Sequence, residues 1–374
     1  MITQQFTFRR GEELMAPAFD IEPGLILVFG NRSILENQNL FFEIRENFPR
    51  VTFAGCSTAG EITNGNVSDD SLTITAIQFE KTTVRSFCQS VDNSSDSFET
   101  GKTLGNELSK DKLKHVMVFS DGLNVNGTEL VKGLRDALGD HVSVTGGLAG
   151  DGAAFVKTVV LNPCGKVESH IVSAIGFYSD DLKVSFGSMG GWDSFGIERL
   201  VTKSKGNVLY ELDNEPALDL YKTYLGDQAS GLPATGLLFP LSMRVSENDD
   251  PVVRTILGVN EEEKSLTFAG DIKQDSYVRL MKANVNRLIN GAAKAAELAA
   301  KPNTNYDLAI LISCVGRKLV LKQLAEEEVE VVGDSFGTDT LITGFYSYGE
   351  IAPFEEFMKC ELHNQTMTIT AFSE

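Results

Sequence analysis

Short apolar runs, each closed by a polar turn, recur along the chain and predict the buried strands of a parallel sheet. Each run is followed by a segment with helical spacing of apolar residues, and then by a second apolar run that enters a loop. This order predicts strand–helix–strand units. The first strands are expected at residues 24–30, 115–119 and 308–313, and the second strands at residues 51–54, 142–145 and 341–343.

Alternating apolar and polar positions after the loops predict antiparallel strands at residues 72–77, 83–90 and 367–372, and a hairpin at residues 155–162 and 169–178. We therefore expect an α/β protein with mixed (α+β) sheets. Helices are predicted between capping and stop signals. They are expected at residues 33–48, 97–108, 126–138, 216–225, 278–300 and 318–328, followed by an edge strand or loop at 329–332.

One pattern of eight residues occurs near both ends of the chain. Residues 55–62 read Gly-Cys-Ser-Thr-Ala-Gly-Glu-Ile, and residues 344–351 read Gly-Phe-Tyr-Ser-Tyr-Gly-Glu-Ile. Each copy is entered from an apolar run, and each is followed by nearly the same strand. We infer two related domains, residues 1–205 and 206–374, that each present a glycine-bounded loop carrying a glutamate.

Composition adds limits to this picture. A chain of 374 residues is long for one core, which agrees with two domains. The formal net charge of −19 repels phosphate backbones and anionic lipids, so nucleic-acid and membrane partners are disfavoured. Five scattered cysteines without a CxxC pair indicate reduced thiols rather than a disulfide framework or a zinc site. Since no apolar leader or membrane-length run is present, we expect a cytoplasmic protein.

The glycine loops are the candidate ligand site. Glycine lets backbone N–H groups approach a ligand without a Cβ in the way, and open α/β sheets bind ligands at the carboxyl ends of their parallel strands. We expect the loops after residues 54, 145 and 343 to line one crevice. Alternatively, Glu61 and Glu350 bind neighbouring backbone and hold the related halves together. The candidate ligand-binding residues are Gly55, Cys56, Ser57, Thr58, Gly60, Glu61, Gly147, Asp151, Tyr346, Gly349 and Glu350.

These segments resemble the FIST family of bacterial signal-transduction sensors, which have an N-terminal and a C-terminal half. The resemblance implies a sensory protein that binds a small ligand, such as an amino acid, and signals to a partner such as a histidine kinase. This chain shows no kinase or receiver segment, so the output is expected in that partner. The motifs are residues 55–62 and 146–151 in the first half and residues 209–218, 253–258, 344–353 and 362–366 in the second.

Some free-standing members that this chain resembles are haem-binding nitric-oxide sensors that control a histidine kinase, which makes haem a second candidate ligand. Haem needs an axial ligand, most simply His. His363 lies in a family motif beside the final strand and is the first choice. Cys56 and Cys360 are weaker alternatives, and no CxxCH motif is present for covalent attachment. The other histidines are His170, in the predicted hairpin, and His115 and His141, expected at exposed element ends.

Catalysis is the third interpretation. Glu61 and Glu350 would then be paired carboxylates for acid–base chemistry, and Cys56 would be a nucleophile. No Cys–His pair at a recognisable spacing supports a nucleophile, and the glycine-rich residues 147–152 lack the features of a nucleotide-binding loop. We therefore expect a protein that is not an enzyme.

Overall fold

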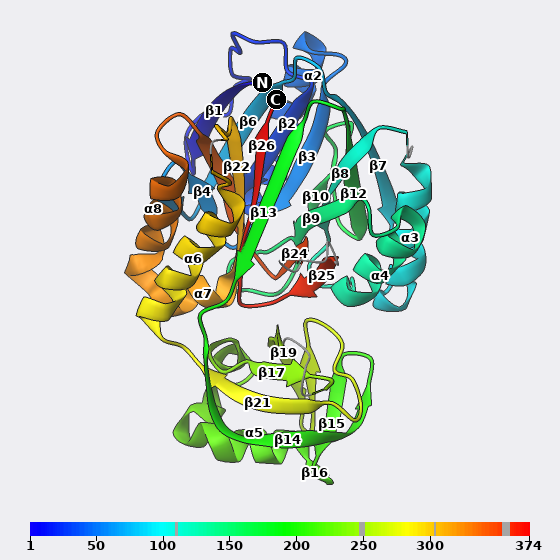
Figure 1. Cartoon of the computed structure of the whole chain (residues 1–374), viewed down its shortest axis with the longest axis vertical. Helices are drawn as coiled ribbons and strands as arrows, with labels where there is room; N and C mark the ends of the chain where they lie inside the picture. Colours follow the sequence, from blue (N-terminus) through cyan, green and yellow to red (C-terminus); the bar gives the residue numbers. More distant parts are fainter. Residues whose placement is uncertain (109–110, 247–250, 303, 354–359) are drawn as a thin grey trace.

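The computed structural model describes residues 1–374 apart from 109–110, 247–250, 303 and 354–359. Within these residues, three six-stranded sheets form a large body, and a smaller domain with its own sheet lies below the body in Figure 1. The α/β class with mixed sheets, predicted from the sequence, is confirmed.

Each body sheet is built on one of the three predicted strand–helix–strand units. In every unit the first strand lies parallel to the second and antiparallel to a third, so the repeated plan is confirmed. The strands are β2 (Leu25–Gly30), β3 (Thr52–Ser57) and β6 (Ser71–Gln78); β8 (Leu113–Ser120), β9 (Ser143–Leu148) and β12 (Ile171–Tyr178); and β22 (Leu308–Cys314), β23 (Leu341–Ser347) and β26 (Met367–Ser373).

Each sheet is completed by short strands from a different unit. After its loop, the first unit adds β4 to the third sheet beside β23, the second adds β10 to the first sheet beside β3, and the third adds β24 to the second sheet beside β9. The hairpin predicted at residues 155–162 and 169–178 is therefore wrong. These strands are β4 (Glu61–Thr63), β5 (Asn66–Ser68), β10 (Val160–Leu161), β11 (Val167–Glu168), β24 (Gly349–Pro353) and β25 (Cys360–His363).

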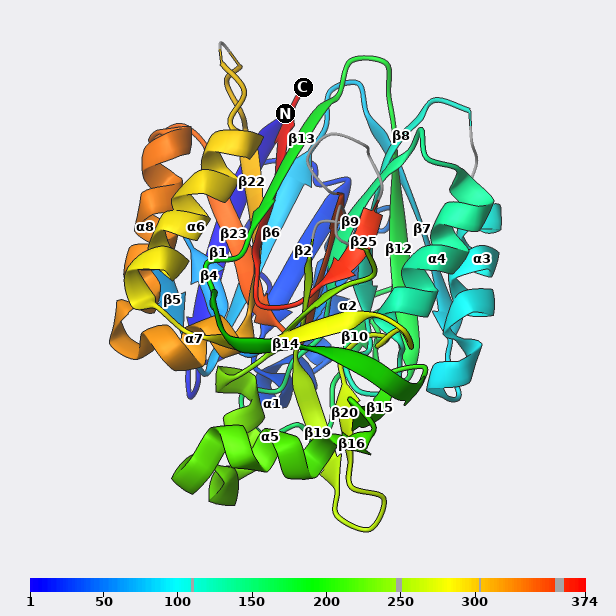
Figure 2. The same ribbon diagram turned by 60° about the horizontal axis from the view of Figure 1, so that its bottom comes forward.

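All three sheets consequently share one strand order, with an edge strand beside the third strand of each unit. Helices cover the outer faces (Figures 1 and 2). The edge strands are β1 (Ile2–Arg9), β7 (Thr83–Ser90) and β13 (Lys183–Met189). The helices are α1 (Arg32–Leu35), α2 (Asn39–Asn47), α3 (Ser97–Glu107), α4 (Gly127–Leu138), α6 (Val285–Ala299), α7 (Val315–Leu321) and α8 (Ala325–Phe336).

The sheets share a central apolar core. Phe29, Phe119 and Phe345 come from the three different sheets and are fully buried. Their ring centroids are 4.8 Å apart for Phe29–Phe345, 5.5 Å for Phe29–Phe119 and 6.1 Å for Phe119–Phe345. Aromatic packing of this kind fixes the three units against one another.

The small domain spans about residues 193–283 and is joined to the body by residues 190–192 and 283–284. The boundary predicted near residue 205 falls in its first hairpin, and the division of the chain there stays a prediction. Its elements are β14 (Asp193–Lys205), β15 (Val208–Leu212), β16 (Glu215–Pro216), α5 (Ala217–Leu225), β17 (Leu241–Arg244), β18 (Val252–Arg254), β19 (Ile256–Asn260), β20 (Ser265–Phe268) and β21 (Tyr277–Lys282).

Other element predictions are also wrong. The single helix expected at residues 33–48 is two helices, α1 (Arg32–Leu35) and α2 (Asn39–Asn47). The helix expected at residues 278–300 begins only at Val285, because residues 277–282 form β21 and pair with β14 and β17. The edge strand or loop expected at residues 329–332 is part of α8. Ala325, Val329 and Val332 are buried on one face of that helix at helical spacing, so packing outweighs the strand preference of valine.

Candidate functional site

The glycine loops begin at equivalent positions in the three units. Gly55, Gly146 and Gly344 each pair with a residue of the parallel neighbour strand. A Cβ at these positions would lie 1.8, 2.0 and 1.9 Å, respectively, from a carbonyl oxygen of that neighbour. Only glycine permits this close approach of two backbones.

The three loops lie in contact with one another, while the crevice that we expected them to line stays a prediction. Backbone N–H groups of Ala59 and Tyr346 donate to the carbonyls of Tyr346 and Gly60, both at 2.8 Å, which joins the first loop to the third. The second loop is joined to the first by Gly150 N to Ser57 O, at 2.8 Å. The third loop is joined to the second by Tyr348 N to Leu148 O, at 3.1 Å. The loops therefore bond mainly to each other.

Glu61 is buried in a cradle of hydroxyl groups. Its Oε1 accepts from Thr58 Oγ1 at 2.5 Å, and its Oε2 accepts from Ser71 Oγ at 2.6 Å and Ser71 N at 3.2 Å. Burial raises the pKa of Glu61 to about 7 against the lowering effect of these hydrogen bonds.

Glu350 repeats this arrangement in the third unit. Its Oε1 accepts from Ser347 Oγ at 2.7 Å, and its Oε2 accepts from Thr366 Oγ1 at 3.0 Å and Thr366 N at 3.1 Å. Burial likewise raises the pKa of Glu350 to about 7. Each glutamate thus ties a crossing strand to the start of its own unit's third strand, which supports the structural interpretation of both residues.

The remaining predicted residues have mixed surroundings. Asp151 accepts from the backbone N–H groups of residues 155–157 and from the hydroxyl of Tyr348, which fixes the second loop to the third. Cys56 is buried, and burial raises the pKa of its thiol, so it stays protonated. Ser57 Oγ accepts from Val159 N at 3.0 Å. Gly60 faces Lys318, and Gly147 packs on Phe345.

Two of the four histidines, His363 and His115, are buried and hydrogen-bonded inside the protein. His363 is buried, and its Nε2 lies 3.0 Å from the carbonyl oxygen of Ala352. Burial lowers the pKa of His363 to about 4, so the neutral ring donates this hydrogen bond through Nε2. His115 was expected to be exposed, but it is fully buried between Ser143 and Thr145. The residues present therefore do not fit haem ligated through Nε2 of His363. Among the described residues, no three His, Cys, Asp or Glu side chains are grouped to hold a metal ion.

Polar groups that sequence reasoning did not single out lie between the body and the small domain. Arg254, at the end of β18, donates to Leu362 O of β25 at 3.2 Å, and Gln365 Nε2 donates to Leu237 O and Thr255 Oγ1, both at 3.0 Å. Asn364 lies between Leu362 and Gln365 in the sequence and is fully buried. These residues could have been found from the sequence, because residues 253–258 and 362–366 carry the family resemblance.

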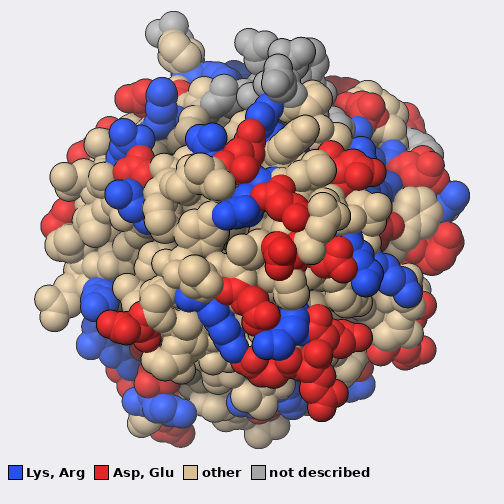
Figure 3. Space-filling model, turned by 90° about the horizontal axis from the view of Figure 1, so that it is seen from below, with Lys and Arg blue, Asp and Glu red and all other residues tan. Residues whose placement is uncertain are grey.

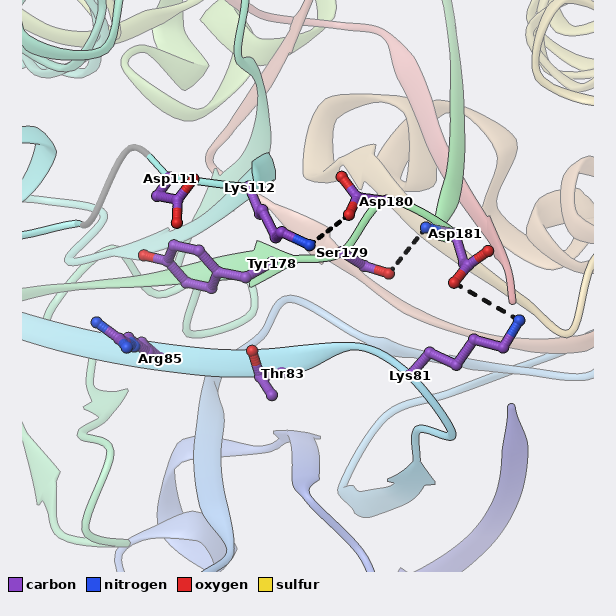
Figure 4. Close-up of a pocket in the computed structure, with 9 residues that line it drawn as sticks. All are labelled: Lys81, Thr83, Arg85, Asp111, Lys112, Tyr178, Ser179, Asp180 and Asp181. Atoms are coloured by element: carbon purple, nitrogen blue, oxygen red, sulfur yellow. Dashed lines mark hydrogen bonds and ion pairs between the residues drawn. The ribbon is translucent and has the colours of Figure 1, made fainter.

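The pockets described here lie away from the loop junction. The one in Figure 4 has a volume of about 350 Å³ at one end of β7 and β12, where Lys112 and Asp180 are 2.5 Å apart and Lys81 and Asp181 are 3.5 Å apart. Another, of about 20 Å³, lies among apolar side chains of the small domain. A third, of about 700 Å³, is an open surface hollow beside β5. Two ion pairs in Figure 4 thus already join four of the charged side chains that line this pocket.

The surface seen from below carries mixed charge. Figure 3 shows acidic and basic side chains interspersed on this face. No helix in the described part of the chain combines the length and apolar character required to cross a bilayer.

Comparisons with known proteins agree with the sequence motifs. Residues 24–215 match the FIST N domain, and residues 217–353 match the FIST C domain. An uncharacterized protein of Methanocaldococcus jannaschii is 25% identical over 328 residues, which cover 79% of this chain and 61% of that protein. The crystal structure of a cyanuric acid hydrolase from A. caulinodans aligns over 100% of this chain and 99% of its own, with a TM-score of 0.40 and 5% identity. A similarity of that size does not bear on activity.

Proposed function

The chain belongs to the FIST family, whose domains are sensory and associated with signalling, and on that premise we propose that it is a non-catalytic sensor. It binds a small ligand where the small domain meets the body, and it signals to a partner protein such as a histidine kinase. The observation that carries this proposal is the polar contact between β25 and β18, because it lies between two parts of the molecule whose relative position a ligand can bias.

The connections between the two parts support this role. The two connections between the body and the small domain are residues 190–192 and 283–284. Trp192 of the first connection donates through Nε1 to Gln365 O at 3.2 Å. Arg317 donates to Gly190 O at 2.9 Å and to Leu288 O at 2.8 Å. A ligand bound at this contact therefore acts directly on the segments that set the position of the small domain.

The glycine loops enter the proposal through the third loop. A Cβ at Gly349 would lie 3.5 Å from Nδ2 of Asn364, so the loop approaches the interdomain contact closely. Glu61 and Glu350 hold the loops in place through their hydroxyl cradles. The loop residues predicted as ligand contacts thus shape the site, and Gly349 borders it.

The test is a thermal-shift screen of the full chain against a panel of neutral, cationic and anionic metabolites. A ligand present at about 100 times its Kd stabilises the folded state by about 2.7 kcal/mol, which raises the melting temperature. We expect at least one compound to raise it and Gly349→Val to abolish the effect. The proposal fails if no compound shifts the wild-type protein, or if every shift persists in Gly349→Val.

A further inference from the structure

We propose that Arg254 and Asn364 form a binding site for a small oxyanion, of the carboxylate or phosphate class, between the small domain and the body. The inference rests on the proposed sensory function and specifies the chemistry of its ligand. Figure 1 shows β25 on the face of the body that is turned toward the small domain.

Asn364 is the first of the two groups. Its side chain is fully buried, and within the described chain neither Oδ1 nor Nδ2 has a hydrogen-bond partner. A buried amide without partners loses hydration without compensation, which native proteins generally avoid. The unpaired Nδ2 donor at the edge of a glycine loop is therefore available to a ligand that brings an acceptor.

Arg254 is the second group. It is 4% exposed, and its Nε and Nη1 donate only to the backbone carbonyls of residues 253, 271 and 362. Nη2 makes no hydrogen bond among the described residues, and no carboxylate oxygen there lies within 4.0 Å of the guanidinium. Burial lowers its pKa to about 10, with opposing effects from the charges of Glu361 and Asp271, so Arg254 stays protonated at neutral pH.

Arg317 shows how this chain usually treats a buried guanidinium. Arg317 is fully buried, and its Nη2 lies 2.7 Å from Oε2 of Glu328, which is also fully buried. Two acidic residues, Glu361 and Asp271, act on the charge of Arg254, and Asp271 is itself bonded by Asn126 and Lys132. Among the described residues, Arg254 therefore has no carboxylate bonded to it as Arg317 has, although a buried charge is costly without one.

Arg254 and Asn364 lie on two chain segments that run side by side. Arg254 bonds to Leu362, and the next residue, Thr255, bonds to Gln365, so residues 362–365 lie alongside residues 254–255. An oxyanion between these segments would accept N–H groups from Nη2 of Arg254, whose other two nitrogens already donate to backbone carbonyls, and from Nδ2 of Asn364. Hydrogen bonds from a charged guanidinium to an anion are strong.

The test uses the full chain with acetate, succinate and inorganic phosphate as probes, in buffers matched in ionic strength with sodium chloride. Isothermal titration calorimetry and thermal shift are measured for the wild type, Arg254→Gln and Asn364→Leu. Arg199→Gln is the control, because Arg199 lies in the same domain and is already paired with Asp213 at 2.8 Å. The carboxylates and phosphate distinguish the two ligand classes.

We expect one probe class to bind the wild type and the control equally. Binding should weaken by roughly thirtyfold in Arg254→Gln, since a buried charge pair would be lost. In anion-free buffer, Asn364→Leu should melt no lower than the wild type, because two unsatisfied polar atoms are removed.

Equal anion binding by the wild type and both site variants would overturn the proposal. So would the absence of anion binding in a wild-type protein that still responds to a neutral or cationic metabolite, a result that leaves the sensory function standing. If no compound of any class shifts the wild type, both proposals fall together.

Discussion

At the scale of single residues, Glu61 and Glu350 are buried carboxyl groups that form no salt bridge with any described residue. Each has two hydroxyl groups and one backbone N–H as partners, one hydroxyl three residues earlier and the other at the start of the unit's third strand. Hydrogen bonds stabilise the charged form, while burial favours the neutral form and raises the pKa of both groups to about 7. Each cradle therefore holds a carboxyl group that changes charge close to neutral pH.

Replacing Glu350 by Gln should make folding less sensitive to pH. Because the pKa of Glu350 rises from 4.5 to about 7 on folding, its stabilising effect is full below about pH 4.5 and is lost as pH rises to about 7. A shift of this size corresponds to about 3 kcal/mol. The fall in unfolding free energy between acidic and mildly alkaline buffer, measured by urea denaturation, should therefore be smaller in Glu350→Gln by about that amount.

Glu326→Gln is the control for this measurement, because Glu326 is exposed on α8. It should keep the wild-type pH dependence. If Glu350→Gln kept it as well, the carboxyl group would be ionised in the folded protein throughout this range.

At the scale of elements, the three parallel strand pairs share one constraint. Val28, Val118 and Leu311 present a carbonyl oxygen where the neighbouring strand must carry glycine. The same substitution at Gly55, Gly146 or Gly344 should therefore have a similar effect, although the loops that follow differ in sequence.

Gly344→Ala should destabilise the protein by roughly 3 kcal/mol, since its methyl group would overlap the carbonyl of Leu311 and push the strands apart. Chemical denaturation measures this loss. Gly24→Ala, where the added Cβ meets nothing closer than 4.0 Å, is the matched control and should change stability little. Equal stability of the two variants would show that β22 and β23 separate without cost.

The sequence predicted the helices and strands better than it predicted the contacts between them. Apolar runs and the repeated octapeptide located the units and the converging loops, because these depend on local pattern. The crossing of β4, β10 and β24 to other sheets depends on pairing between distant segments, which periodicity does not encode. Arg254 and Asn364 were missed because their significance lies in partners that they lack, and only coordinates show that.

At the scale of the whole molecule, one buried ion pair helps to set the position of the small domain. Arg317 of α7 pairs with Glu328 of α8 and also donates to Gly190 and Leu288, close to both connections to the small domain. The pair therefore couples two body helices to the segments on which the small domain turns.

Arg317→Met should destabilise the protein by about 3–5 kcal/mol, because it leaves the Glu328 carboxylate buried without its positively charged partner. Hydrogen exchange should also rise in the connecting residues 190–192 and 284–288. The double variant with Glu328→Leu should recover much of the stability but not the slow exchange, since the bonds to Gly190 and Leu288 remain absent. Unchanged exchange in both variants would show that Arg317 does not hold the connections.

Because β4, β10 and β24 each pair with a sheet of another unit, the order of synthesis affects how the molecule folds. The β4–β5 hairpin emerges from the ribosome long before its partner β23 (Leu341–Ser347) is translated. Ile62 and the carboxyl group of Glu61, both buried in the finished protein, must therefore wait for most of the polypeptide before they are enclosed. The third sheet is completed only after β23 has been translated, and a nascent fragment ending anywhere in the small domain would carry an unsatisfied sheet edge.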